Sequence, residues 1–168
     1  MRSGDGGDVA ASSAPPRRRR QELTPTQRAL GLLTRREHSR RELARKLTSK
    51  GVEPDEAKTV VETLSASGWQ DEARFAELLV RSRVGAGHGP VRIRAELGTH
   101  ALGSEIIAAA METFDGDWAE NARDLVNRRH PAALAGDRVI QRKATDFLLR
   151  RGFTMEQIRR AMDSAVPD

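Results

Sequence analysis

The amino-acid sequence predicts an all-α fold, in which three tandem three-helix units form an elongated, curved array preceded by a disordered N-terminal tail. Three observations support this prediction. Apolar residues recur at helical spacing from residue 24 onward. Helix caps and glycine stops return at an interval of about 50 residues, which is typical of a repeat array. Alternating apolar and polar runs, which would indicate strands, are absent. The handedness of the array stays open.

Residues 1–23 form the predicted tail. They are rich in Gly, Ser, Ala, Pro and Arg, and they carry too little apolar surface to offset the entropy of ordering. The run Arg17–Arg20 could act as a basic arm on nucleic acid, but a solvated tail is the favoured interpretation.

The first unit, residues 24–68, opens with a clear helix start. Thr24 provides an N-cap, Pro25 a first-turn proline and Gln27 the N3 partner of a capping box. Residues 39–42 (Ser-Arg-Arg-Glu) predict a second capping box at the start of the next helix.

That second helix is predicted to stop at Gly51, in the left-handed conformation that glycine favours. Pro54 then begins the third helix, and Gly68 ends the unit. The apolar side chains expected on the inner faces of the three helices are Ala29, Leu30, Leu33, Leu43, Leu47, Ala57, Val60, Val61 and Leu64.

The same pattern returns in residues 69–115 and 116–168. Residues 154–157 (Thr-Met-Glu-Gln) predict a further capping box at the start of the last helix. Because each unit in such an array buries its open face on a neighbour, apolar positions should coincide between units. They do so when Leu47 is aligned with Leu97 and Leu148, Gly51 with Ala101 and Gly152, Leu43 with Ile93 and Ala144, and Val61 with Met111 and Met162.

Composition removes several classes of function. The chain has no cysteine, so thiol catalysis, disulfides and cysteine-ligated metals are excluded. Its four histidines show no metal-ligand spacing, and Glu37 beside His38 is interpreted as a surface pair rather than an acid–base pair. No serine lies in a nucleophile elbow. We expect a cytoplasmic, monomeric protein that is not an enzyme and has no catalytic residue, cofactor, metal ion or membrane span.

Charge is distributed unevenly along the chain, whose net charge is +5. Residues 28–50 carry eight Lys or Arg and two Glu, residues 74–94 five Arg and one Glu, and residues 128–151 seven Lys or Arg and two Asp. The predicted third helices of the first two units are acidic instead. If the units stack in one orientation, their first two helices form a basic surface that suits an acidic or polyanionic partner.

The middle unit provides the main candidates for contact with that partner. Arg74 and Arg81 lie two turns apart and should share the outer face of one helix. The opposite, inner face is predicted to hold Phe75, Leu78, Leu79 and Ser82. On the next helix Arg92 should point outward, whereas Arg94 lies nearer the apolar boundary. The primary candidates are Arg74, Arg81, Arg83, Arg92 and Arg94; a secondary basic surface comprises Arg36, Arg40, Arg41, Arg45, Arg142, Lys143, Arg150 and Arg151.

Two further features have a structural interpretation that we favour. The glycine-rich residues 85–90 follow a helix and lack a Lys-Ser/Thr ending, so a tight turn is favoured over a nucleotide-binding loop. Trp69 and Trp118 are predicted to be wedges between units, with stacking on nucleic-acid bases as the second interpretation.

Four segments resemble the signatures of the RecX family, the bacterial regulators of the RecA recombinase. They are residues 39–47 (SRRELARKL), 68–83 (GWQDEARFAELLVRSR), 87–97 (GHGPVRIRAEL) and 147–153 (FLLRRGF). The resemblance covers about residues 26–165. The chain departs from the family at Gln70, where members usually carry an apolar residue, and in its tail.

The resemblance implies a crescent of three three-helix units that binds RecA and its filament on single-stranded DNA. It implies inhibition of the recombinase ATPase, strand exchange and coprotease activity, and thus modulation of DNA repair, together with weak DNA binding. Two alternatives stay open: an autonomous DNA-binding helical module, and a passive helical scaffold. A DNA-binding module that makes about six phosphate contacts should lose roughly 10³-fold in affinity between 50 and 200 mM salt.

Overall fold

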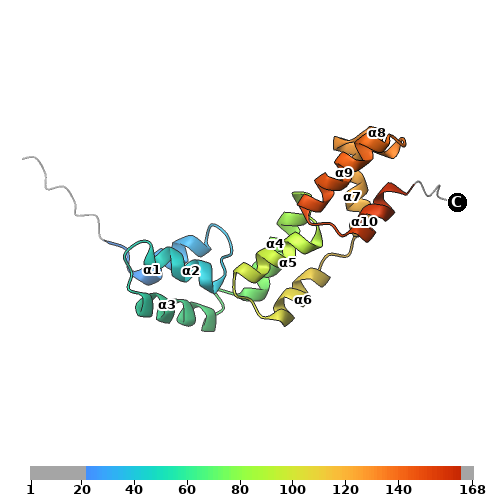
Figure 1. The fold of residues 1–168 in the computed structure, drawn as a ribbon. Coiled ribbons are helices and arrows are strands. Elements are labelled where there is room, and N and C mark those ends of the chain that lie inside the picture. The colour runs from blue at the N-terminus through green and yellow to red at the C-terminus, as the bar shows by residue number, and fades with distance from the viewer. Residues whose placement is uncertain (1–21, 164–168) are drawn as a thin grey trace, which may run out of the picture.

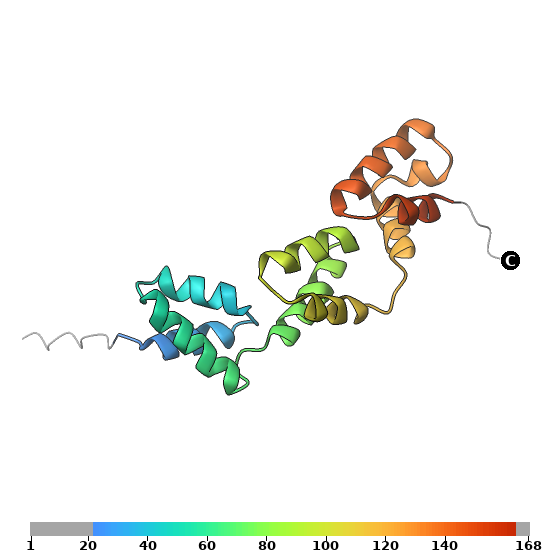
Figure 2. The same ribbon diagram turned by 60° about the horizontal axis from the view of Figure 1, so that its bottom comes forward.

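The structure is a computed structural model, and it describes residues 22–163. Within that range the chain forms ten helices and no strand. Figure 1 shows three helical units that follow one another in chain order, and Figure 2 shows that they remain separate bodies from a second direction. The all-α fold class and the elongated array are therefore confirmed. The expected tail and its Arg17–Arg20 run lie outside the described residues.

Unit 1 contains α1 (Pro25–Leu33), α2 (Arg40–Thr48) and α3 (Pro54–Ala66). The capping box at Thr24 is formed, with Thr24 Oγ1 accepting from Gln27 N–H and Gln27 Oε1 accepting from Thr24 N–H. The buried core of the unit comprises Ala29, Leu43, Leu47, Val52, Ala57, Val61 and Leu64. The apolar stripes therefore pack as their periodicity predicts.

Units 2 and 3 repeat this arrangement. Unit 2 contains α4 (Glu72–Gly85), α5 (Pro90–Thr99) and α6 (Ser104–Glu112). Unit 3 contains α7 (Trp118–Arg129), the four-residue α8 (Pro131–Leu134), α9 (Arg138–Arg151) and α10 (Met155–Met162). Helix α8 is an addition to the three-helix pattern, and it begins at a proline that suits a first helical turn.

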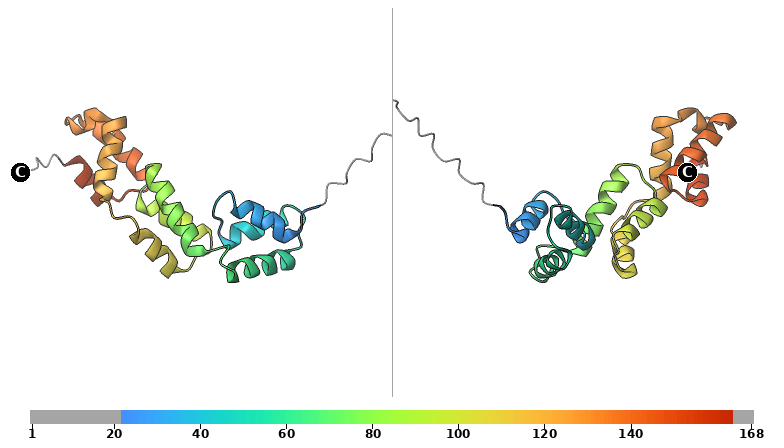
Figure 3. Two further views of the ribbon diagram at one scale, coloured as in Figure 1. Left: turned by 180° about the vertical axis from the view of Figure 1, so that it is seen from behind. Right: turned by 60° about the vertical axis from the view of Figure 1, so that its left-hand side comes forward.

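The array bends toward one side (Figures 1 and 3). In both views α3 and α6 lie along the lower, convex edge, whereas α1, α2, α4 and α5 lie above them. Since α3 and the segment around α6 are the acidic parts of the first two units, the basic helices of these units occupy the concave side.

Backbone conformation supports the sequence alignment of the units. Gly51, Ala101 and Gly152 follow α2, α5 and α9, and their φ angles are 87°, 59° and 90°. Ala101 is the sole non-glycine residue with positive φ among residues 22–163. The left-handed stop is thus a property of the repeat, and unit 2 keeps it although the residue carries a Cβ atom.

Replacing Ala101 with glycine is expected to raise the free energy of unfolding by up to about 1 kcal/mol. The left-handed conformation costs an L-residue roughly 1–2 kcal/mol, and part of the gain is offset by the larger entropy of glycine in the unfolded chain. Urea unfolding measures the change. The converse Gly51→Ala, at a site where an added Cβ meets no atom within 4 Å, should be destabilising. A neutral or destabilising A101G would contradict this interpretation.

Several local predictions are wrong. At α2, Ser39 Oγ accepts from Glu42 N–H at 3.1 Å, but the Glu42 carboxylate turns to Arg36 and His38 and leaves the capping box half formed. On α4 the buried side chains are Phe75, Ala76 and Val80, whereas Leu78 and Ser82 are exposed, because the helix packs against α6 as well as α5.

The two tryptophans differ from one another. Trp118 contacts the cores of both unit 2 and unit 3 and packs its ring against Phe114, so its role as a wedge is confirmed. Trp69 is 59% exposed, and the prediction that it is a wedge is wrong. The neighbouring Gln70 is buried in its place.

Candidate functional site

The joint between units 1 and 2 is made by polar side chains. Arg40 N–H donates to Glu72 Oε1 at 2.6 Å, and Ser39 Oγ lies 2.9 Å from His100 Nδ1. On its outer side Arg74 donates to Glu37 Oε1 at 2.6 Å. Among the described residues the core clusters of the two units share no side chain. Hydrogen bonds and ion pairs therefore hold unit 1 in place.

Gln70 lies at the centre of this joint and is only 1% exposed. Its Nε2 donates to His38 O at 3.2 Å and to Glu72 Oε1 at 3.1 Å, and its Oε1 accepts from Arg40 Nε at 3.3 Å. The departure from the family pattern at this position is therefore accommodated by a satisfied network. A polar residue at a position where an apolar one is expected was the sequence signal for it.

His38 is buried beneath the same joint, so the prediction that Glu37 and His38 are a surface pair is wrong for His38. Its Nδ1 lies 3.1 Å from Glu42 Oε2. Burial lowers the pKa of His38, and this outweighs the opposing effect of Glu42. Burial alone raises the pKa of Glu42, but hydrogen bonds from Arg36 and His38 leave it below its ordinary value. At neutral pH the pair consists of a neutral imidazole beside a carboxylate.

Acidification is expected to destabilise unit 1 through His38. Because the folded state lowers the pKa of His38, the unfolded chain binds more protons below about pH 6.5, and the free energy of unfolding falls as the pH is lowered through that range. Urea unfolding at pH 7.5 and 5.5 measures the loss, which should be smaller in His38→Gln. His130→Gln, in unit 3, is the control. If the free energy of unfolding fell equally between pH 7.5 and 5.5 in both variants and in the wild type, His38 would not be the source of the pH dependence.

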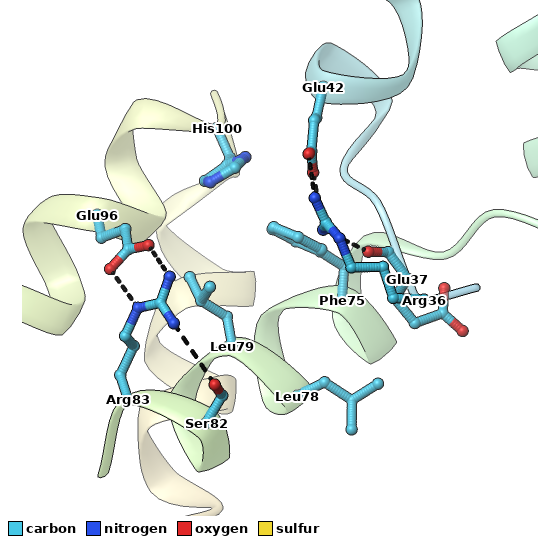
Figure 4. Close-up of a pocket in the computed structure, with 10 residues that line it drawn as sticks. All are labelled: Arg36, Glu37, Glu42, Phe75, Leu78, Leu79, Ser82, Arg83, Glu96 and His100. Carbon is cyan, nitrogen blue, oxygen red and sulfur yellow. Dashed lines mark hydrogen bonds and ion pairs between the residues drawn. The ribbon is translucent and has the colours of Figure 1, made fainter. Parts of the chain in front are cut away.

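A groove lies at this joint (Figure 4). It encloses about 470 Å³. Phe75, Leu78 and Leu79 of α4 lie between its two walls. The ion pairs Arg83–Glu96 and Arg36–Glu42 lie on opposite sides of them. The groove thus combines an apolar floor with two ion pairs on opposite sides of it.

The seam between units 2 and 3 is built differently, by direct backbone contact. Gly89 N–H donates to Arg151 O at 2.8 Å, and Val91 N–H donates to Gly152 O at 3.0 Å. A Cβ atom at Gly89 would lie 2.4 Å from the carbonyl of Gly152. The glycine-rich turn is therefore where unit 3 rests on unit 2. The sequence predicted the turn but not this contact.

The five primary arginines do not form one patch. Arg74 and Arg81 share the outer face of α4, but Arg83 lies about 180° from Arg74 at about 100° per residue. Arg83 is half-buried and donates to Glu96 through Nε at 2.8 Å and through Nη2 at 2.7 Å. This pairing raises the pKa of Arg83 and lowers that of Glu96.

Arg81 and Arg92 are exposed and form no ion pair within residues 22–163. Arg81 borders a pocket of about 200 Å³ beside Phe114 and Asp115. Arg92 faces the seam, where its Nη1 lies 3.5 Å from Arg150 O. Arg94 is exposed about 200° around α5 from Arg92.

The secondary basic residues likewise fall into two groups, those engaged in contacts within the chain and those that are exposed without an ion pair. Arg36 and Arg40 are engaged at the first joint, and Arg151 donates to Ala86 O at 2.8 Å across the seam. The remaining members are exposed and form no ion pair in the described part of the chain: Arg41 and Arg45 on α2, and Arg142, Lys143 and Arg150 on α9.

Residues 22–163 contain no group of three or more acidic or histidine side chains placed to hold a metal ion. None of their helices is both long and apolar enough to cross a membrane.

Comparison with known proteins identifies relatives along most of the chain. Three family models match, described as the first, second and third three-helix domains of RecX, over residues 26–64, 71–111 and 115–162. "Regulatory protein RecX" of Stenotrophomonas maltophilia (strain R551-3) is 60% identical over 141 residues, which are 84% of this chain and 86% of the relative. The protein of the same name from Xanthomonas oryzae pv. oryzae (strain MAFF 311018) is also 60% identical over 141 residues, 84% of this chain and 88% of the relative.

A solved structure shares the fold. The crystal structure of RecX from Lactobacillus salivarius superimposes with a TM-score of 0.69 at 22% identity, over 82% of this chain and 92% of that chain. At this identity the likeness bears on the fold alone.

Proposed function

Because the chain belongs to the RecX family of regulatory proteins, we propose that it binds the RecA recombinase and the filament that RecA forms on single-stranded DNA with ATP. By lying along this filament the chain inhibits the recombinase ATPase, strand exchange and coprotease activity. It acts by binding rather than by catalysis, as a monomer in the cytoplasm.

One observation carries the proposal. The chain is an elongated array bent toward its basic helices, and Arg81 and Arg92 of the middle unit are exposed without an ion pair in the described range. A curved array can follow a filament over several subunits, and guanidinium groups pair bidentately with carboxylates and phosphates. Both groups are present in a nucleoprotein filament.

The groove between units 1 and 2 supports contact with the protein component. Leu78 is 42% exposed at its edge. Exposed Trp69 belongs to the link between α3 and α4, near the same joint. Aromatic and apolar anchors beside arginine are the residues that usually dominate protein interfaces. We therefore place the recombinase against α4, with Arg74 keeping the joint in position through Glu37.

Electron microscopy of the chain added to preformed RecA filaments tests the proposal. Density is expected on the filaments, with α4 and α5 of unit 2 against the recombinase. A parallel titration with naked DNA separates this function from that of an autonomous DNA-binding module. Such a module would bind naked DNA tightly at 50 mM salt. Its affinity for the RecA filament would be no higher than its affinity for the DNA strand alone. Undecorated, unaltered filaments at saturating protein would contradict the proposal.

A further inference from the structure

The two joints of the array are made by different kinds of contact. At the seam between units 2 and 3, Gly89 and Val91 donate backbone hydrogen bonds to carbonyl groups at the end of α9. Within residues 22–163, no backbone hydrogen bond runs from the segment that ends at Gln70 to the segment that begins at Asp71. The first joint, between units 1 and 2, therefore lacks the backbone contact that fixes the seam.

The seam is also closely packed. Trp118 contacts the cores of both unit 2 and unit 3. A Cβ atom at Gly89 would lie 2.4 Å from the carbonyl of Gly152, so the two backbones leave no space between them. Closely packed surfaces resist small displacements, because a shift creates either a void or a clash. These contacts favour a single rigid body made of units 2 and 3.

The link between units 1 and 2 changes from one unit to the other at a single point. Residues 67–71 connect α3 to α4 (Figure 2). Trp69 N–H and Gln70 N–H both donate to Leu64 O, at 2.9 and 3.2 Å, so the link up to Gln70 stays attached to α3. Asp71 instead caps α4 through its side chain. The backbone between Gln70 and Asp71 is therefore where the two units can turn relative to one another.

Side-chain hydrogen bonds hold unit 1 against unit 2. Every hydrogen bond that crosses the first joint in the described chain involves the side chain of Glu72, Arg74 or His100. The ion pair between Arg74 and Glu37 lies at the surface, where the Arg74 side chain is 45% exposed. Water competes for such pairs and salt screens them, so they contribute little to stability. The orientation of unit 1 therefore depends on contacts that break at small cost.

Two open spaces between the units leave room for movement. The groove of about 470 Å³ is lined by Arg36 of unit 1 and by Leu79 of unit 2, among others. A second pocket, of about 500 Å³, is lined by residues that include Arg41 and Ser65 of unit 1 and Ile106 of unit 2. Side chains do not fill either space, so unit 1 can turn without first displacing packed atoms. Turning changes the width of the groove, because both units line it.

We propose that residues 67–71 form a hinge on which unit 1 turns against a rigid body made of units 2 and 3. Gln70, Glu72 and Arg74 hold the hinge in the observed orientation, and their release widens or narrows the groove. The array thereby adapts its curvature to the surface that it meets. This inference goes beyond the proposed function, and it concerns the chain alone.

The test is the distribution of distances between pairs of nitroxide labels, measured by double electron–electron resonance. The chain has no cysteine, so labels can be attached at introduced ones. Lys58→Cys with Glu105→Cys places the labels on α3 and α6, across the first joint. Glu105→Cys with Lys143→Cys places them on α6 and α9, across the seam. All three positions are exposed.

Release of the hinge should affect one of these label pairs alone. Gln70→Leu with Arg74→Ala removes the central amide and the surface ion pair, and should widen the distribution across the first joint at least about twofold. The distribution across the seam should keep its width. Arg74→Ala alone, at an exposed position, should widen the same first distribution to a smaller extent.

Arg83→Ala is the matched control. It breaks the Arg83–Glu96 ion pair, which lies entirely within unit 2, and should change neither distribution. Circular dichroism checks that all variants are folded. An unchanged width across the first joint in the folded variants, or equal broadening across the joint and the seam, would overturn the hinge. Filament inhibition is measured separately, so such a result would leave the proposed function standing.

Discussion

Reversing the charge of Arg81 and Arg92 together, as Arg81→Glu with Arg92→Glu, is expected to abolish inhibition of the DNA-dependent ATPase of RecA. Both side chains are exposed and form no ion pair within residues 22–163, so the substitutions break no ion pair, although Arg92→Glu removes the hydrogen bond to Arg150 O. Repulsion from a carboxylate or phosphate partner costs several kcal/mol, and the apparent affinity for the filament should fall by at least about 100-fold. The rate of ATP hydrolysis at increasing protein concentration measures the effect.

The matched control is Arg129→Glu with Arg159→Glu, which changes the net charge equally on exposed positions of unit 3. It should inhibit as the wild type does. The two single variants then show how much of the lost inhibition is due to Arg81, beside Asp115, and how much to Arg92, at the seam. A folded Arg81→Glu, Arg92→Glu variant with undiminished inhibition would remove these residues from the contact surface.

Gly89→Ala is expected to open the seam between units 2 and 3. The φ and ψ angles of Gly89, −86° and 168°, are accessible to alanine, so the effect is steric. The added Cβ would lie 2.4 Å from backbone atoms of Gly152, which cannot move aside as a flexible side chain can. Relief of the clash separates the backbone groups of the seam and should lower the free energy of unfolding by about 1–3 kcal/mol.

Hydrogen exchange shows where this loss arises. The amides of residues 89 and 91 should exchange faster in Gly89→Ala, since both donate across the seam. Gly98→Ala is the control in the same helix: an added Cβ there meets no atom within 4 Å, and alanine should stabilise α5 by up to about 1 kcal/mol. Unchanged exchange at residues 89 and 91 would show that the seam tolerates the side chain.

The family and the helical units could be predicted from the sequence because their signals are local. A capping box, such as that at Thr154, lies within four residues. The apolar stripe that buries Leu43 and Leu47 lies within two turns. The left-handed stops at Gly51 and Gly152 lie within three residues of the helices they follow. Each of these features needs no knowledge of the tertiary structure, and the predicted resemblance to the RecX family is confirmed.

The candidate site depends on pairs that are distant in the sequence, and periodicity does not reveal them. Gln70 meets the carbonyl of His38 across 32 residues, and Ser39 meets His100 across 61. Arg83 was placed among the partner contacts by its residue type, yet Glu96 on the next helix binds it. The sequence identified the basic residues, but only the packing of the units separates those engaged in ion pairs from those left exposed.

The most direct test of filament binding is the ATPase rate of preformed RecA filaments on single-stranded DNA as the wild-type chain is added. The experiment is run at a salt concentration at which the chain alone no longer binds DNA. Inhibition is expected at amounts well below one chain per recombinase subunit, since each array contacts several subunits or a growing end. Inhibition that begins only when the chain is present in excess over DNA binding sites, or no inhibition at all, would contradict filament binding.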